Sequence, residues 1–289
     1  MIIFRTRFGV GTGILQKMNF KLLLACDLDR TIFPNGQAPF SIEALEKFSH
    51  LVSDSKICLA YISGRSLSRA LKGMEEFNVP VPNIYVGDCG TTIYIRNSDG
   101  KFEEHKEWKS EFLDDWGEIR GNNINSLIAS IPSLVPQEED NQNIYKQSYY
   151  FPASQQNEIK KEVDEKLLSL NIKFQVITLL EEEDNKGYLD VIPESATKEH
   201  ALKYLQRYLF VTEDNVIYAG DAGNDLLALT SGCKAIVVNN ASPNFKEEVR
   251  HVAKNKGLLE KIYFAKGEYD GMNGNYIAGI LEGVHYFRF

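Results

Sequence analysis

Unbroken runs of apolar residues alternate with amphipathic segments along much of this chain. Three such runs, at residues 22–26, 57–62 and 216–219, contain no polar alternation and are short enough for strands. Runs of this kind are typical of strands buried on both faces of a parallel sheet. Helical periodicity follows the first two runs, at 41–52 and 67–77. The alternation predicts parallel strand–helix–strand units.

The pattern changes in the middle of the chain. Residues from about 100 to 195 are more polar and predict a helix over 157–169 and strands over 173–179 and 187–192. A helix over 197–208 then resumes the first pattern. We therefore predict an α/β protein with a Rossmann-like doubly wound parallel sheet core (residues 18–98 and 196–289) and an inserted α+β domain (residues 99–195).

Composition and charge narrow the class of protein. The 289 residues carry a formal net charge of −8, which argues against nucleic acid as the main partner. No apolar run approaches the roughly 20 residues of a membrane span, and the four cysteines lack metal-ligand spacing, so we expect a cytoplasmic protein with reduced thiols. Residues 1–17 form a basic leader that fits a weak targeting segment, a tail or an over-extended start.

The first apolar run stops at two carboxylates, Asp27 and Asp29. Spacing by two places both on one side of the strand, beyond its end. Two like charges that close repel each other, and a bound cation would relieve the repulsion. A turn rich in Asp, without a ligand, is the alternative for this stretch taken alone.

The apolar run at 216–219 also ends in carboxylates, in the sequence GDAGND at 220–225. Its glycines let the backbone turn tightly and approach a ligand. The strand at 57–62 ends in Ser63 and Gly64 before a helix, which is a common phosphate-binding arrangement but a weak signal alone. Lys198 lies in the first turn of a predicted helix, where a cation opposes the helix dipole, so helix formation does not explain it.

Together these stretches resemble the four motifs of the haloacid dehalogenase superfamily of phosphotransferases. The motifs are DLDRT at 27–31, SGR at 63–65, Lys198 and GDAGND at 220–225, in the superfamily's order, and the insertion is similar to its type IIB cap domain. The segments VGDCGTTIY, QNIYKQSYYF, LDVIP and IAGILEGVHYF resemble the sucrose-phosphate phosphatase branch. Two positions depart from that branch: Arg30 stands where Asn is usual, and Glu199 where glycine is common.

The resemblance implies roles for individual residues. Asp27 would be the nucleophile, Asp29 the general acid and base, and Lys198 a catalytic cation. Phosphate would be bound by Thr31, Ser63 and Gly64, and Mg²⁺ by Asp27, Asp29 and Asp221, with Asn224 and Asp225 supporting it. The sugar would contact four residues of the cap, Gln142, Asn143, Tyr145 and Lys146. An amphipathic strand with one exposed polar face is the alternative for these last four.

We therefore expect an Mg²⁺-dependent phosphatase that hydrolyses a sugar phosphate, such as a phosphorylated disaccharide or glycoside, through an aspartyl-phosphate intermediate. Mannosyl-3-phosphoglycerate, mannosylfructose-phosphate and glucosylglycerol-phosphate phosphatases share the scaffold and fit the same motifs. A sugar phosphomutase and a non-catalytic phosphosugar-binding subunit are the rival classes. A glycosyltransferase that makes the substrate is a possible pathway partner.

Overall fold

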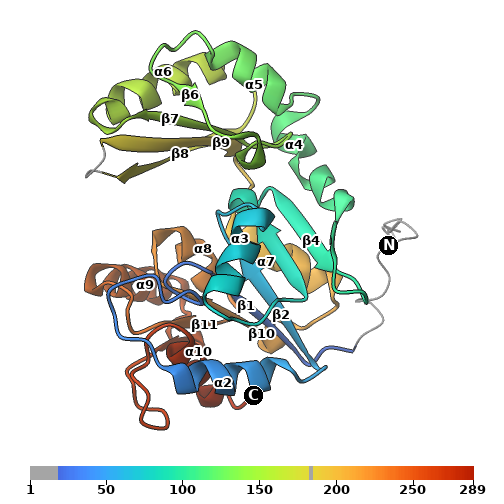
Figure 1. The fold of residues 1–289 in the computed structure, drawn as a ribbon, viewed down its shortest axis with the longest axis vertical. Coiled ribbons are helices and arrows are strands. Elements are labelled where there is room, and N and C mark those ends of the chain that lie inside the picture. The colour runs from blue at the N-terminus through green and yellow to red at the C-terminus, as the bar shows by residue number, and fades with distance from the viewer. Residues whose placement is uncertain (1–18, 182–184) are drawn as a thin grey trace. The chain divides into compact units, whose positions relative to one another are not determined.

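The computed structural model describes residues 19–181 and 185–289, so the basic leader at 1–17 lies outside the described residues. The chain divides into two compact units (Figure 1). The larger unit comprises residues up to Glu107 and from Lys198 onward, and the smaller unit comprises Trp108–Thr197. The inserted unit therefore begins later than residue 99, because the segment before Trp108 adds a strand to the larger sheet.

The larger unit is built on an eight-stranded sheet with the order β12-β11-β10-β1-β2-β3-β4-β5. The six strands from β12 to β3 run parallel, and β4 and β5 are added antiparallel at one edge. The bounds are β1 Leu22–Cys26, β2 Ile57–Ile62, β3 Ile84–Gly87, β4 Thr92–Arg96, β5 Phe102–Glu104, β10 Val216–Gly220, β11 Lys234–Val237 and β12 Ile262–Phe264. This arrangement confirms the expected α/β fold.

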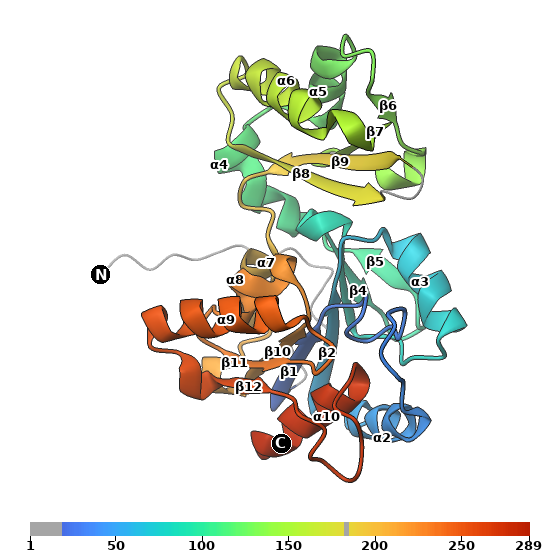
Figure 2. The same ribbon diagram turned by 90° about the vertical axis from the view of Figure 1, so that its left-hand side faces the viewer.

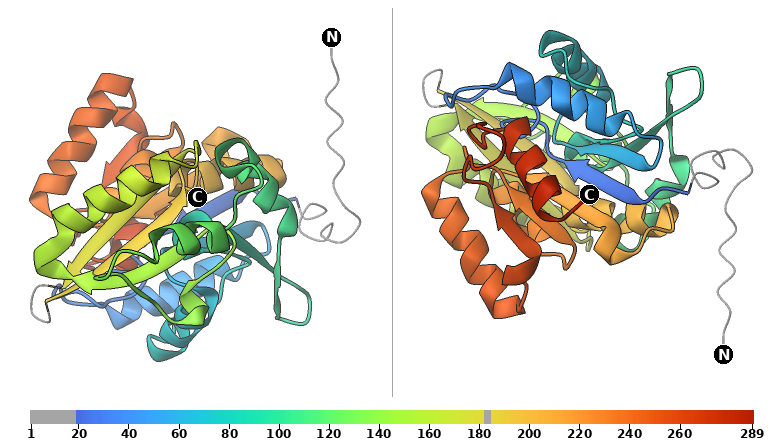
Figure 3. Two further views of the ribbon diagram at one scale, coloured as in Figure 1. Left: turned by 90° about the horizontal axis from the view of Figure 1, so that it is seen from above. Right: turned by 90° about the horizontal axis from the view of Figure 1, so that it is seen from below.

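Helices cover both faces of this sheet. Figure 2 shows α2 (Ile42–Val52), α3 (Leu67–Glu76) and α10 (Ile277–Tyr286) on one side of it. The other side carries α7 (Lys198–Tyr208), α8 (Leu226–Leu229) and α9 (Pro243–Lys256). Every residue of β1 is buried, which agrees with its unbroken apolar sequence. Seen from below, α2 and α10 lie side by side (Figure 3).

Strand β1 lies between β10 and β2, so the strand order reverses at β1. The chain passes from β1 to β2 on one side and returns much later to β10 on the other. In open α/β sheets, ligands bind beyond the carboxyl ends of the strands where the strand order reverses in this way. The segments that follow β1 and β10 therefore meet at one place.

The smaller unit is a four-stranded antiparallel sheet, β6-β7-β9-β8, with helices on one face. Its elements are α4 Leu113–Trp116, α5 Gly121–Ile128, β6 Val135–Pro136, β7 Gln147–Pro152, α6 Gln156–Leu168, β8 Phe174–Glu181 and β9 Lys186–Pro193. Helices α5 and α6 lie over the strands in the view from above (Figure 3). The rings of Phe112, Trp116 and Tyr145 pack together in its core, with centroids 5.1 to 5.8 Å apart.

Candidate active site

The turn after β1 brings the first two carboxylates to the end of the sheet. The backbone N–H of Asp27 still donates to the carbonyl of Ala219 on β10, so Asp27 continues the strand and its side chain is buried. The carbonyl of Leu28 then accepts three backbone N–H groups, from residues 31–33, and this closes a tight turn. Asp29 lies on the turn and is about two-fifths exposed.

Lys198, the first residue of α7, bridges two of the carboxylates. Its Nζ lies 2.6 Å from Oδ1 of Asp27 and 2.7 Å from Oδ1 of Asp225, and all three side chains are buried. A buried ammonium between two carboxylates forms charge-assisted hydrogen bonds. The structure therefore brings together two of the motifs predicted from the sequence, which are 171 residues apart.

Asp225 is fully engaged by hydrogen-bond donors. In addition to Lys198, the Tyr218 hydroxyl donates to its Oδ1 at 2.6 Å, and the backbone N–H groups of Asp221 and Ala222 donate to its Oδ2 at 3.0 and 3.1 Å. Gly220 is required for this packing, because a Cβ there would lie 2.5 Å from the Asp225 carboxyl carbon. Asp225 thus shapes the loop and holds Lys198.

Asp221 completes a cluster of three buried carboxylates. Asp27, Asp221 and Asp225 each offer an oxygen within 4.8 Å of the others. Oδ1 of Asp221 accepts a hydrogen bond from Thr31 at 3.3 Å. Oδ2 is buried and, within the part of the chain that the structure describes, accepts no hydrogen bond. Nε of Arg30 lies 3.4 Å from this oxygen.

The cluster shifts the acidity of its members. Burial raises the pKa of Asp27 to about 8, and the charges of Asp225 and Asp221 add to the rise, while Lys198 opposes it. Burial, helped by Asp225, raises the pKa of Asp221 to about 6. Burial lowers the pKa of Lys198, but its two carboxylate partners outweigh that effect and hold the pKa above its ordinary value. Without a cation, burial and the neighbouring carboxylates therefore favour the protonated forms of Asp27 and Asp221.

These residues fit a divalent cation such as Mg²⁺. The donors are oxygens only, which hard cations prefer. The buried Oδ2 of Asp221 lacks a hydrogen-bond partner among the described residues, and a cation would satisfy it. Asp225 already accepts four donors, so it suits an indirect role, and Asn224 is exposed on the same loop.

The predicted phosphate-binding residues lie at the ends of neighbouring strands. Thr31 is buried and contacts Asp221. Ser63 is buried directly after β2, the strand next to β1, and its hydroxyl accepts the backbone N–H of Arg65 at 3.2 Å. Gly64 is exposed, and a Cβ there would lie 3.5 Å from the sulfur of Cys89.

Three residues of the site were assigned no role from the sequence alone. Nε and Nη2 of Arg65 donate to the two carboxylate oxygens of Asp29 at 2.9 and 2.5 Å. The Asn35 amide also donates to Asp29, at 2.7 Å. Tyr218, which contacts Asp225, lies within an apolar strand. Its hydroxyl, which needs a hydrogen-bond partner when buried, is the only feature of the sequence that could have indicated this contact. Arg65 could have been found from its place in the SGR motif.

The four predicted sugar-binding residues of the smaller unit make internal contacts. The Gln142 side chain both donates to and accepts from the backbone of Ser148, and Oδ1 of Asn143 accepts the N–H of Tyr145. The Tyr145 ring is buried in the aromatic core. Nζ of the buried Lys146 donates to the Asn141 carbonyl at 3.2 Å and lies 3.5 Å from Asp190. Their role toward a sugar stays a prediction.

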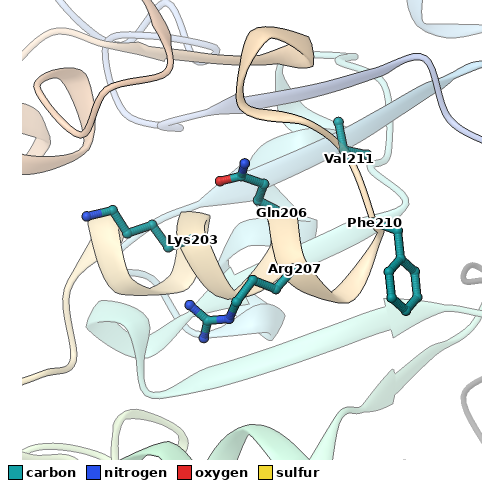
Figure 4. A pocket seen from close by; sticks show the side chains of 5 residues that line it. All are labelled: Lys203, Gln206, Arg207, Phe210 and Val211. Atoms are coloured by element: carbon teal, nitrogen blue, oxygen red, sulfur yellow. The ribbon is translucent and has the colours of Figure 1, made fainter. Parts of the chain in front are cut away.

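A surface pocket of about 510 Å³ lies along the later part of α7 and is lined by the residues labelled in Figure 4: Lys203, Gln206, Arg207, Phe210 and Val211. Lys198 starts that helix, so Gln206 lies about 12 Å further along it. Gln142 and Asn143 line another pocket of about 370 Å³ in the smaller unit. We assign the chemistry to the carboxylate cluster and Lys198, because the exposed surface of α7 supplies no reactive group.

Two solved structures share the fold of this chain. The sucrose-phosphatase of Synechocystis sp. PCC6803, solved with sucrose and phosphate, superposes with a TM-score of 0.67 at 22% identity, covering 93% of this chain and 99% of that one. A haloacid dehalogenase-like hydrolase from Bacillus subtilis superposes with a TM-score of 0.63 at 14% identity, covering 93% and 92%. The fold is therefore that of haloacid dehalogenase-like hydrolases.

The sequence narrows this class to a family. The model of the sucrose-6F-phosphate phosphohydrolase family matches residues 20–288, so the chain belongs to that family. A HAD-like hydrolase of Nitrosococcus oceani is 36% identical over 93% of this chain and 72% of its own length. The mannosylfructose-phosphate phosphatase of Agrobacterium fabrum is 25% identical over 76% and 84%. A sucrose-phosphatase of Arabidopsis thaliana is 25% identical over 93% of this chain but only 60% of its own length.

Family membership confirms the expected superfamily, branch and enzyme class, a sugar-phosphate phosphatase. Among the described residues, no helix is both long and apolar enough to cross a membrane.

Proposed function

We propose that this protein is an Mg²⁺-dependent phosphatase that hydrolyses a phosphorylated disaccharide or glycoside, of which sucrose-6-phosphate is one example. The observation that carries the proposal is the bridge from Lys198 to two buried carboxylates, with a third carboxylate beside them. The printed names of two relatives, mannosylfructose-phosphate phosphatase and sucrose-phosphatase, support a phosphorylated disaccharide as the substrate class.

Asp27 is the nucleophile in this proposal. One of its carboxylate oxygens attacks phosphorus, the bond from phosphorus to the sugar oxygen breaks, and an aspartyl-phosphate forms. Lys198 orients Asp27 through the bond to Oδ1 and stays charged, because its pKa lies above the ordinary value. Water then attacks the phosphoryl group, which releases phosphate and restores the Asp27 carboxylate.

Asp29 serves as acid and base in turn. It gives its proton to the departing sugar oxygen and later takes a proton from the attacking water, so the proton balance closes over one cycle. Arg65 donates a hydrogen bond to each carboxylate oxygen of Asp29, and the Asn35 amide donates to one of them. These contacts hold the Asp29 side chain in one orientation on its partly exposed turn.

The remaining groups would stabilise the negative charge that develops on the phosphoryl oxygens. Thr31, Ser63 and the backbone at Gly64 would bind these oxygens together with Lys198. The carboxylates of Asp27 and Asp221 and the backbone carbonyl of Asp29 would hold Mg²⁺, with Asn224 and Asp225 in support. When bound, Mg²⁺ neutralises the repulsion between an anionic nucleophile and an anionic phosphoester.

The smaller unit would select the sugar. Amide and ammonium groups are suitable partners for sugar hydroxyls. Gln142 and Asn143 line the pocket in that unit, which supports contact with a polyol. Tyr145 and Lys146 are buried, so in the proposal they support this loop and reach the sugar only at its edge. Such a substrate would be supplied by transfer of a glycosyl group onto a sugar phosphate.

The test is phosphate release by the purified protein with Mg²⁺ from a panel of sugar phosphates. The panel contains sucrose-6-phosphate, mannosylfructose-phosphate, mannosyl-3-phosphoglycerate, trehalose-6-phosphate and simple hexose phosphates. We expect one disaccharide or glycoside phosphate to react far faster than the hexose phosphates. Transfer of the phosphoryl group to a sugar instead of water would favour a phosphomutase, and folded protein that releases no phosphate from any of them would refute the proposal.

A further inference from the structure

Arg30 is held at the edge of the carboxylate cluster by its backbone. Its N–H donates to Oδ1 of Asn35 at 2.8 Å, and its carbonyl accepts from the Asn240 amide at 2.7 Å. Its φ of 59° lies in the left-handed region. An arginine rarely adopts this conformation without support, so the surrounding contacts fix the point from which its side chain extends.

The guanidinium extends toward the one oxygen of Asp221 that lacks a hydrogen bond. Nε of Arg30 lies 3.4 Å from Oδ2 of Asp221. Across residues 19–181 and 185–289, that contact is the only ion pair of Asp221, and Oδ2 accepts no hydrogen bond. The Asp221 side chain is buried, whereas half of the Arg30 side chain is exposed and can therefore move.

We propose that Arg30 weakens and tunes the divalent-cation site by competing for Oδ2 of Asp221. This inference rests on the proposed function, because it takes Asp221 as a metal ligand. A cation bound at Asp221 would meet the positive guanidinium at short range, and the guanidinium must withdraw before that oxygen can act as a ligand. The protein therefore binds divalent cations less tightly than the same carboxylates would without Arg30.

The expected size of the effect follows from charge and exposure. A guanidinium and a divalent cation that share one carboxylate repel each other strongly at low dielectric, but solvent around the exposed half of Arg30 screens much of this. We expect removal of the charge to tighten cation binding about three- to tenfold. Asn is a suitable replacement, because it tolerates the left-handed conformation better than most residues.

The experiment measures binding of Mn²⁺ to the full chain after metal is removed with a chelator. Electron paramagnetic resonance reports free Mn²⁺, and competition gives the Mg²⁺ affinity. The variants are Arg30→Asn, Arg30→Gln, and Arg30→Lys, which keeps the charge. Arg250→Asn is the matched control, because it removes one positive charge from α9, where the guanidinium pairs with Glu247.

We expect both neutral variants at position 30 to bind Mn²⁺ about three- to tenfold more tightly than wild type, with Arg30→Lys and Arg250→Asn close to wild type. Unchanged or weaker binding in the folded neutral variants would overturn the inference. So would equal tightening in Arg250→Asn, since the effect would then come from net charge alone.

Asp221→Asn separates this inference from the proposed function. If wild type binds one Mn²⁺ and Asp221→Asn binds far more weakly, the metal site stands whatever the Arg30 variants show. If wild type binds no Mn²⁺, or Asp221→Asn binds it equally well, the metal site of the proposed function fails, and the inference fails with it.

Discussion

Each unit of this chain buries a lysine, and the partners of the two lysines differ. In the larger unit, Lys198 contacts Asp27 and Asp225, and Asp221 adds a third buried carboxylate. In the smaller unit, Lys146 contacts Asp190 and a backbone carbonyl, and Ser148 also donates to Asp190, at 2.5 Å. The first cluster holds three carboxylates to one ammonium and, among the described residues, a buried oxygen without a hydrogen bond, whereas the second pairs one ammonium with one carboxylate.

This difference indicates which cluster carries the reaction and which one stabilises the fold. A cluster with uncompensated buried charge costs folding free energy, so its arrangement calls for a ligand or a reaction to explain it. A balanced cluster joins a loop to a strand and can persist for stability alone. We therefore assign the reaction to the Lys198 cluster, and only the choice of sugar to the region around Lys146.

The largest effect is expected for Asp27→Asn, which removes the proposed nucleophile from the carboxylate cluster. We expect turnover to fall by about 10⁴-fold or more while the protein stays folded, because no other group replaces the attacking carboxylate. Steady-state phosphate release and circular dichroism check both parts. Turnover within about tenfold of wild type would rule out Asp27 as the nucleophile.

Lys198→Met tests whether the charge of the lysine serves the reaction as well as the fold. The variant leaves two buried carboxylates without their cation. We expect kcat to fall about 10²- to 10³-fold and the free energy of unfolding of the metal-free protein to fall by about 3 kcal/mol. Urea unfolding and phosphate release measure these two quantities. A stable variant with nearly normal kcat would place Lys198 outside the reaction.

Arg65→Lys tests the orientation of Asp29, the proposed general acid and base. Lysine keeps the charge but cannot form the paired hydrogen bonds that Arg65 makes to both oxygens of Asp29. We expect kcat to fall about tenfold with a smaller change in KM, since a misdirected proton donor slows chemistry more than binding. A change confined to KM would assign Arg65 to substrate binding instead.

Lys146→Met applies the Lys198 substitution to the smaller unit and so tests the comparison directly. We expect KM for the best disaccharide phosphate to rise about tenfold, with kcat changed less than in Lys198→Met. The free energy of unfolding is measured beside it, because Asp190 loses a partner. An unchanged KM in folded protein would argue against a role in sugar binding, and a loss of kcat as large as in Lys198→Met would remove the distinction between the units.

The smallest effect is expected at His105, a buried titratable group outside both lysine clusters. Its Nε2 lies 2.6 Å from the Tyr204 hydroxyl, and burial lowers its pKa although Glu107 opposes the shift. The unfolded chain therefore takes up this proton first as pH falls, so stability is complete above about pH 6.5 and declines below it. We expect the loss of unfolding free energy between pH 8 and pH 5.5 to be smaller in His105→Gln than in wild type. Equal losses would show that His105 does not contribute.

The sequence predicts where Asp27 and Asp221 lie, because each follows a strand with an unbroken apolar pattern. The strand before Asp27 and the strand before Asp221 were predicted within a residue or two, and strand order then brings their ends together. Lys198 stood out because its charge opposes the dipole of its own helix.

Contacts between distant residues were harder to predict. Arg65 contacts Asp29 across 36 positions, and no local pattern specifies such a pair. Helix α9 was missed although Ser242 caps it and Pro243 opens it, since its polar surface weakens the periodicity. In the smaller unit, the Gln142 amide bonds to the backbone of Ser148 on β7, a contact that needs an amide side chain but also depends on loop geometry that the sequence does not show.

The most direct test of the account is to trap the covalent intermediate. The protein is mixed with Mg²⁺ and a sugar phosphate labelled with ³²P, quenched in acid within a single turnover, and digested for mass spectrometry. The account predicts that the label is found on Asp27, that it disappears as phosphate is released, and that Asp27→Asn carries none. Label on another residue, or turnover with no labelled protein at any time, would contradict it.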